Sequence, residues 1–124
     1  MAVTPVFDSN ILIDYINGYK PAVEELNRHP VRLISIVSWM EVLVGCSAHE
    51  QEQKVKDWMA AFFTTLFIDY DIASHAVVIR RNTRLKLPDA VILATARSRN
   101  TLLITRNHKD FPPHDPQIRV PYEV

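Results

Sequence analysis

The sequence predicts an α/β fold, a three-layer α/β/α sandwich with a mainly parallel central sheet. Short segments rich in apolar and β-branched residues alternate along the chain with longer segments of helical periodicity, the pattern of parallel strands joined by helices. An apolar fraction of 48% and a charged fraction of 23% are typical of a globular protein. The 124 residues contain no linker or repeat, so we expect one domain spanning residues 1–124.

The first part of the chain is predicted to form two strands and two helices. Val3–Phe7 is a short apolar run that predicts a buried strand. Ser9–Asn17 has apolar residues at helical spacing, and Gly18 is a plausible C-terminal stop for that helix. Pro21–Arg28 predicts a short helix with proline in its first turn, and Arg32–Val37 predicts a second buried strand.

The remaining elements continue the alternation. Ser38 is expected to begin a helix as its N-cap, with Glu41 three residues later as the partner in a capping box. Apolar residues at helical spacing and short β-branched runs then predict helices over Gln51–Thr64, Ile72–Leu85 and Pro88–Arg99, and strands over Leu66–Ile68, Thr101–Thr105 and, at an edge, Ile118–Val120.

Charge and composition exclude several classes of protein. The net charge is zero, but eight basic residues and one acid, Asp89, lie between Arg80 and Lys109, giving +7 there. A basic region around one acid suits a polyanion, although solvated helix faces are an alternative. Two glycines are too few for a Gly-rich phosphate loop. The one cysteine, Cys46, excludes an intrachain disulfide and a zinc site built from several cysteines.

Three acids stand where an apolar segment ends or a helix is predicted to begin. Asp8 follows the first strand, Glu41 follows the second, and Asp89 opens the helix after Leu87-Pro88. Carboxylates amid apolar residues are usually paired or bound to metal. Because active sites of parallel sheets form beyond the carboxyl ends of the strands, these acids are expected to converge. Oxygen ligands alone favour a hard cation such as Mg²⁺ and hence phosphate chemistry.

Four motifs in order resemble one family. They are Asp8-Ser9-Asn10, Ser38-x-x-Glu41, the segment 88–96 that begins Pro88-Asp89, and the segment 103–111 that runs from Leu103 to Phe111. Together they are similar to the PIN domain, the metal-dependent ribonuclease fold, and more closely to the VapC-type toxins of toxin–antitoxin pairs. The resemblance covers nearly the whole chain.

This resemblance implies a Mg²⁺- or Mn²⁺-dependent endoribonuclease that leaves a 5′-phosphate and a 3′-hydroxyl. It implies that Asp8 and Asp89 are metal ligands, and that Glu41 is a ligand through water or a base for the attacking water. Asn107 stands where many members have a fourth acid, and Asp110 follows it. These two residues are expected to complete the rim of the site, Asn107 as a metal ligand through its amide oxygen and Asp110 as a further catalytic acid. One cation is expected to be held firmly, and whether a second arrives with substrate is left open.

Other residues are expected to support the site. Ser9 and Asn10 are expected to orient Asp8 or the waters on the metal, and Thr105 to hydrogen-bond near Asp8 or a phosphate. The expected phosphate contacts are Arg84, Lys86 and Arg106. Trp39 and Trp58 are expected to pack in the core or against a partner in preference to stacking on bases.

Structural alternatives exist for the same residues. Asp8 could only cap a helix, Glu41 could only serve a capping box, and Asp89 could only complement a helix dipole. Asp110 could cap a turn, and Asn10 could be a turn residue. The alternative function is a non-catalytic PIN module that binds RNA or protein. A phosphoryl-transfer domain of the receiver or dehalogenase type is disfavoured, because the dehalogenase type requires a second aspartate where this chain has Asn10.

The resemblance also implies partners. They are an RNA substrate, either tRNA or rRNA, a VapB-type antitoxin whose C-terminal segment crosses the active site, and a second copy of the chain in a homodimer. The apolar side of Gln51–Thr64, with Trp58, Phe62 and Phe63, is expected to serve the dimer, the antitoxin or the core. No apolar segment approaches the length of a membrane span, so we expect a cytoplasmic protein.

Overall fold

The structure, a computed structural model, describes residues 3–112 and 114–124 of the chain. Within these residues a five-stranded parallel sheet has the order β3-β2-β1-β4-β5. The strands are β1 (Val6–Phe7), β2 (Leu33–Ser35), β3 (Thr64–Leu66), β4 (Leu103–Ile104) and β5 (Ile118–Arg119). The helices are α1 (Ser9–Ile16), α2 (Lys20–Asn27), α3 (Ile36–Val44), α4 (His49–Phe62), α5 (Tyr70–Asn82) and α6 (Leu87–Ser98).

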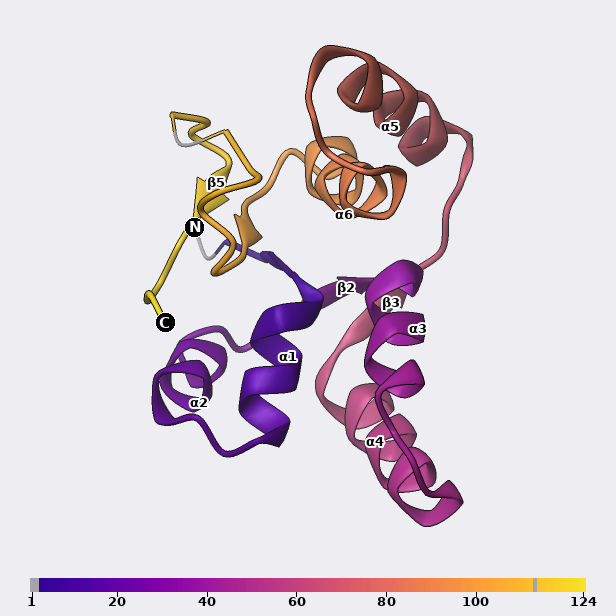
Figure 1. The fold of residues 1–124 in the computed structure, drawn as a ribbon, viewed down its shortest axis with the longest axis vertical. Helices are drawn as coiled ribbons and strands as arrows, with labels where there is room; N and C mark the ends of the chain where they lie inside the picture. The colour runs from indigo at the N-terminus through magenta and orange to yellow at the C-terminus, as the bar shows by residue number, and fades with distance from the viewer. Residues whose placement is uncertain (1–2, 113) are drawn as a thin grey trace.

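Helices cover both faces of the sheet, which confirms the predicted α/β/α sandwich. Helices α5 and α6 lie on one side, and α1, α2 and α4 lie on the other (Figure 1). The strands supply both cores by alternation, because successive side chains point to opposite faces. Val6 and Leu103 pack with the α5–α6 side, whereas Phe7 and Ile104 pack with the α1–α2–α4 side. Strands β1 and β4 are therefore apolar on both faces, as buried parallel strands are.

The boundary between β2 and α3 differs from the prediction. The strand stops at Ser35, whose hydroxyl accepts a 3.0 Å hydrogen bond from the Val37 amide and so caps α3. The predicted cap at Ser38 and its capping box with Glu41 are wrong, because Ser38 already lies inside the helix. Both serines satisfy the sequence rule for an N-cap, and the earlier one is used.

The third strand also lies two residues earlier than predicted. Thr64–Leu66 pairs with β2 in a register that sets Leu33 opposite Thr64 and Ser35 opposite Leu66. The predicted strand Leu66–Ile68 is therefore wrong at both ends, and Phe67 and Ile68 are exposed beyond the sheet. Pairing with β2 decides this register, which local composition does not encode.

Further element ends move by a few residues. Helix α5 begins at Tyr70 because the Asp69 carboxylate accepts a 2.8 Å hydrogen bond from the Ile72 amide. It ends at Asn82, three residues before the predicted end. The edge strand β5 lies within the predicted range.

A buried ion pair fastens this edge strand to α2. The Glu25 side chain is only 3% exposed, and it accepts hydrogen bonds from Arg119 Nε at 2.8 Å and Arg119 Nη2 at 2.9 Å. His29 Nε2 lies 3.1 Å from the same carboxylate. Burial raises the pKa of Glu25, but Arg119 and His29 outweigh it and bring that pKa below its ordinary value of 4.5.

We expect Glu25→Gln to lower the free energy of unfolding by about 2 kcal/mol, because it leaves the Arg119 guanidinium without its charged partner. The pKa of Glu25 is lowered in the folded state, so its contribution is present above about pH 4.5 and is lost as pH falls through the folded-state value. Urea denaturation across this range measures both effects.

Glu24→Gln is the matched control for this substitution. Glu24 lies on the same helix, but its side chain is 57% exposed and its contact with Lys20 is 4.0 Å long. A surface pair of this kind contributes little, so the control should change stability by less than about 0.5 kcal/mol. Equal losses in the two variants would contradict a special role for the buried pair.

Candidate active site

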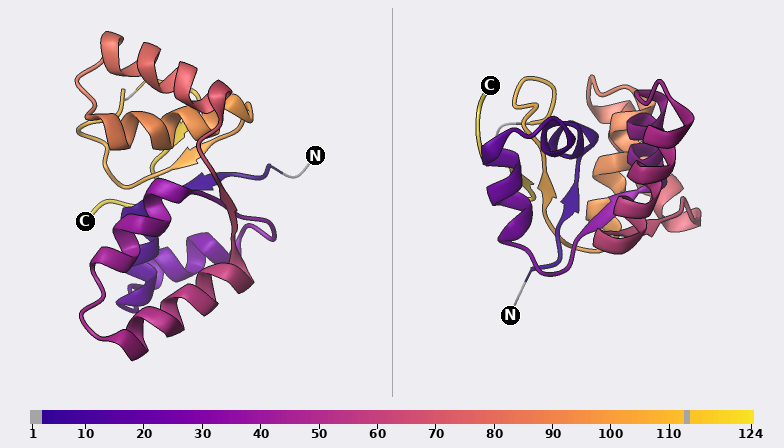
Figure 2. Two further views of the ribbon diagram at one scale, coloured as in Figure 1. Left: turned by 90° about the vertical axis from the view of Figure 1, so that its right-hand side faces the viewer. Right: turned by 90° about the horizontal axis from the view of Figure 1, so that it is seen from below.

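Asp8 follows the carboxyl end of β1. Strand β4 is parallel to β1 and ends beside it, so both strands point toward the site (Figure 2). Its side chain is buried. One carboxylate oxygen accepts a 2.7 Å hydrogen bond from the Ser9 amide, so Asp8 does cap α1. The other accepts a 2.8 Å hydrogen bond from the Thr105 hydroxyl and a 3.3 Å one from Asn10 Nδ2. The carboxylate is therefore held from both neighbouring segments.

Glu41, on α3, lies at the same end of the strands. The Ser9 hydroxyl donates a 2.6 Å hydrogen bond to Glu41 Oε1, and Ser9 Oγ also lies 3.0 Å from Ser38 Oγ. Because α3 begins at Ile36, Glu41 falls in the second turn and faces α1 together with Ser38. Ser9 thus connects the two acids, because its hydroxyl donates to Glu41 and its backbone amide donates to Asp8.

Neighbouring acids raise the pKa values of Asp8 and Asp89. Burial raises the pKa of Asp8 from 3.8 to about 6, and the charges of Asp89 and Glu41 add to this rise against the lowering by the Thr105 hydrogen bond. Asp89 lies in the first turn of α6, as predicted. Burial, Glu41 and Asp110 raise its pKa above the ordinary value. An edge crowded with negative charge in this way is relieved by a cation.

The donor set fits a hard divalent cation, with water completing its coordination. Within residues 3–112 and 114–124, no three acidic, histidine or cysteine side chains lie close enough together to hold one ion by themselves. Mg²⁺, however, commonly keeps several waters and takes only one or two carboxylates directly. The buried Asp8 carboxylate and the nearby acids supply oxygens and excess negative charge, the chemistry such an ion requires.

The loop after β4 carries the two residues expected at the rim. Asn107 Nδ2 donates to Asp110 Oδ2 at 2.9 Å, and the Asp110 amide donates to Asn107 Oδ1 at 3.3 Å. The Asn107 amide donates to the Thr105 hydroxyl at 3.0 Å, which ties the loop to the site. The side-chain oxygen of Asn107 is therefore engaged by the loop itself, while the exposed Asp110 lies close enough to affect the pKa of Asp89.

Arg106 is held by residues that sequence reasoning missed. Its Nε donates to Asp14 Oδ2 at 2.7 Å, and the Tyr122 hydroxyl donates to the same oxygen at 2.8 Å. Its backbone amide lies 3.4 Å from Asn10 Oδ1 and donates to it. The spacing of Asn10 and Asp14 on one face of a helix is the signal that could have revealed Asp14.

The other two expected phosphate contacts lie nearer to Asp89. Lys86 is exposed immediately before α6, and its charge counteracts the rise of the Asp89 pKa. Arg84 is exposed two residues earlier. Their contacts with phosphate stay a prediction.

The two tryptophans lie against other side chains. Trp58 stacks on Tyr15 with ring centroids 4.9 Å apart and meets Phe63 edge to face at 5.2 Å. Lys56 Nζ lies 5.8 Å from the centre of the Trp39 ring. Trp58 therefore belongs to the packing of α1 against α4.

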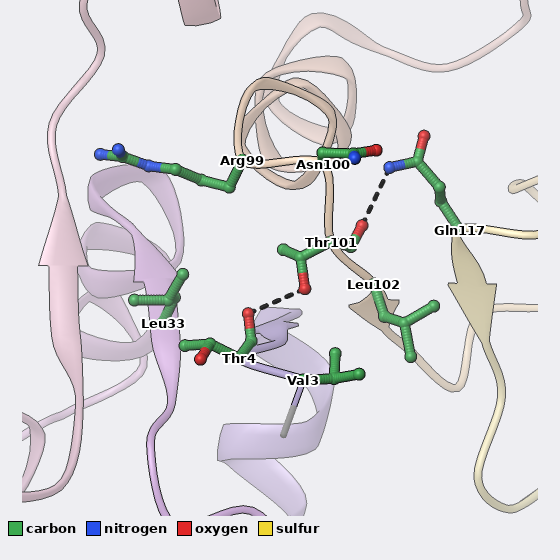
Figure 3. A pocket seen from close by; sticks show the side chains of 8 residues that line it. All are labelled: Val3, Thr4, Leu33, Arg99, Asn100, Thr101, Leu102 and Gln117. Carbon is green, nitrogen blue, oxygen red and sulfur yellow. Dashed lines mark hydrogen bonds between the residues drawn. The ribbon is translucent and has the colours of Figure 1, made fainter. Parts of the chain in front are cut away.

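A pocket lies at the opposite end of the strands, where they begin. This pocket of about 580 Å³ is bordered by Thr4, Arg99, Thr101 and Gln117 (Figure 3). The Thr101 hydroxyl donates to the Thr4 carbonyl at 2.9 Å, and Gln117 Nε2 donates to the Thr101 carbonyl at 3.0 Å. The lining residues Thr4, Leu33 and Thr101 precede or begin β1, β2 and β4, whereas Asp8 follows β1. This pocket and Asp8 therefore lie at opposite ends of the strands.

Comparison with known proteins decides the family. The PIN domain family matches residues 6–112, which include Asp8, Glu41, Asp89 and Thr105. The chain belongs to the PIN-domain family. This confirms the resemblance inferred from the four motifs. No curated protein is similar to this PIN domain at a significant level.

Several solved structures are similar to this PIN domain. One chain, of a toxin–antitoxin complex from Klebsiella pneumoniae, is 43% identical, with 98% of this chain and 100% of that chain covered and a TM-score of 0.90. A chain of DNA-bound VapBC from Salmonella typhimurium is 24% identical, covering 94% and 96%, with a TM-score of 0.77. A chain of FitAcB from Neisseria gonorrhoeae is 16% identical, covering 98% and 100%, with a TM-score of 0.79. The last two support the fold alone.

One further observation concerns membranes. Among the described parts of this PIN domain, no helix combines the length and apolar character that a membrane crossing requires.

Proposed function

We propose that this PIN domain is a Mg²⁺- or Mn²⁺-dependent endoribonuclease that acts as the toxin of a type II toxin–antitoxin pair. The observation that carries the proposal is the buried Asp8 carboxylate, hydrogen-bonded to Thr105 and Ser9 and surrounded by the charges of Asp89 and Glu41. A hydrolytic site that needs a hard cation and a phosphate substrate accounts for this arrangement. The 43% identical chain from a toxin–antitoxin complex supports the biological role.

In this proposal Asp8 and Asp89 hold the cation. When bound, the cation lowers the pKa of a coordinated water and offsets negative charge on the phosphate. Thr105 and the Ser9 amide fix the direction of the Asp8 carboxylate before the ion arrives. Ser9 donates to Glu41 Oε1 and thereby orients the carboxylate, whose other oxygen can accept a proton from the attacking water.

The proposed partners are an antitoxin of the VapB type and a second copy of the chain. The 43% identical chain from Klebsiella pneumoniae comes from a toxin–antitoxin complex, which supports the antitoxin as a partner. Exposed apolar side chains on α3 and α4 offer surface for such partners, including Met40 at 47%, Val44 at 84% and Phe62 at 49% exposure. An antitoxin arginine would pair with the acids of the site.

We expect the purified protein to cleave RNA in Mg²⁺ or Mn²⁺, to lose activity in excess EDTA, and to regain it when either ion is restored. The reason is that the proposed site depends on the cation to lower the pKa of the attacking water. A gel assay with total tRNA and with rRNA measures this, and mapping the ends of the fragments checks for 5′-phosphate and 3′-hydroxyl. Cleavage that persists in EDTA would contradict metal dependence. RNA binding without cleavage in either ion would support the non-catalytic module instead.

A further inference from the structure

A small polar pocket adjoins the candidate active site. It has a volume of about 280 Å³ and lies between the start of α1 and the loop after β4. Its described lining is Asn10, Arg106, Asn107, His108, Lys109 and Val124. Asn10 belongs to both places, since its Nδ2 also donates to Asp8 Oδ2 at 3.3 Å. A group bound in this pocket would therefore lie next to whatever binds at Asp8.

The side chains that line this pocket are suited to an anion. None of the described lining residues has an acidic side chain, and two of them, Arg106 and Lys109, have cationic ones. The Arg106 charge is balanced by Asp14, which fixes its guanidinium through Nε at 2.7 Å and Nη2 at 3.4 Å. Lys109 is exposed and takes part in none of the ion pairs within the described residues. Its positive charge is therefore available to a ligand.

Lys109 also borders a second hollow. This pocket, of about 420 Å³, is lined by Arg84, Lys109, Asp110 and Phe111 among others. Lys109 thus borders two hollows that each include an arginine in their lining. Asp110, whose charge raises the pKa of Asp89, lines the second of them. A single small anion would fill only one hollow, whereas an extended polyanion such as a nucleic acid strand can occupy both.

We propose that the pocket lined by Asn10, Arg106 and Lys109 binds a backbone phosphate of the RNA strand next to the phosphate that is cleaved, with Lys109 as its main contact. This inference rests on the proposed function, because it takes RNA as the ligand. Asp14 and Tyr122 act as positioning residues, since they fix Arg106 at the pocket wall. Lys109 and His108 are not among the phosphate contacts expected from the sequence, which are Arg84, Lys86 and Arg106.

The test measures binding of a fluorescein-labelled, single-stranded 2′-O-methyl oligoribonucleotide by anisotropy, in Mg²⁺ and on an Asp89→Asn background that prevents cleavage. We expect Lys109→Gln to raise the Kd at least about tenfold, the lower limit for loss of one charged hydrogen bond. The slope of log Kd against log salt concentration should fall by about 0.7, the value for one phosphate contact on a single strand. Lys54→Gln, an equal charge change at an exposed site on α4, is the control and should alter neither quantity.

A second measurement identifies the phosphate. One phosphate at a time is replaced by a neutral methylphosphonate, and binding is compared between the parent and Lys109→Gln proteins. At one position the replacement should weaken binding to the parent protein about as much as Lys109→Gln does, and should cause no further loss in that variant. Independent, additive losses at every position would overturn the inference.

The remaining outcomes also decide the matter. An unchanged Kd for Lys109→Gln, or losses equal to those of Lys54→Gln, would overturn the phosphate pocket while leaving RNA cleavage by the parent protein intact. A weaker complex with the purified antitoxin but not with the oligonucleotide would overturn it in favour of a protein ligand. Loss of binding in Lys109→Gln without cleavage by the parent protein would support the pocket and contradict the nuclease. The two proposals can therefore fail separately.

Discussion

Asp8→Asn and Asp89→Asn are each expected to lower the rate of RNA cleavage at least about a thousandfold. Each substitution removes one negative charge and, in the proposed mechanism, one of the two carboxylates that would hold the cation. Neither should unfold the domain, because asparagine preserves the size of the side chain. Initial rates of cleavage in Mg²⁺, with circular dichroism to verify folding, measure the effect.

Two comparisons sharpen this experiment. Glu41→Gln is expected to reduce the rate less, about ten- to a hundredfold, because the amide retains an oxygen for the Ser9 hydroxyl but cannot accept a proton as a base does. Asp57→Asn, on the exposed surface of α4, should cleave at the parent rate. If Asp8→Asn or Asp89→Asn cleaved like Asp57→Asn, the assignment of the metal ligands would be wrong.

Asp8→Asn is also expected to stabilise the protein in the absence of divalent cations. Burial and neighbouring acids raise the pKa of Asp8 from 3.8 to about 6, so the folded protein prefers the neutral acid. The free energy of unfolding therefore decreases as pH rises from about 3.8 to about 6, and the full penalty is present above that range. This difference corresponds to about 3 kcal/mol. Asparagine removes the charge but replaces the hydrogen bonds imperfectly, which leaves a gain of about 1–2 kcal/mol.

Urea denaturation at pH 7.5 measures this gain in EDTA and again in Mg²⁺. Mg²⁺ should stabilise the parent protein, because a ligand that binds only the folded state shifts the unfolding equilibrium. It should stabilise Asp8→Asn far less. The difference in free energy of unfolding between the two proteins should therefore become smaller or change sign when the ion is added. A lower stability of Asp8→Asn in EDTA would show that its hydrogen bonds to Ser9 and Thr105 matter more than the buried charge.

The fold could be predicted because its signals are local. Apolar alternation places Val6 and Phe7 on opposite faces of the sheet, and the strand–helix order implies parallel pairing. Element ends were predicted wrongly where two residues suit the same cap, or where the partner strand fixes the position of a strand. Ser35 and Ser38 both suit an N-cap, and the position of β3 is fixed by its partner β2, not by its own composition.

The candidate site could be predicted only in part, for a related reason. Asp8 and Thr105 meet because both follow neighbouring parallel strands, a relation that the strand order implies. The pairing of Arg106 with Asp14 joins residues 92 apart, and that of Tyr122 with Asp14 joins residues 108 apart. Periodicity places Asp14 on the same face of α1 as Asn10 but does not name its partners, because both contacts join segments that are far apart along the chain.

The order of the strands has a consequence for protein synthesis. Thr105, which holds the Asp8 carboxylate, is made 97 residues after Asp8. Strand β1 likewise waits for β4, its neighbour in the sheet. A nascent chain therefore cannot assemble this carboxylate cluster until Thr105 has left the ribosome, so the proposed RNA cleavage could not begin while the segment between β1 and β4 is still being made.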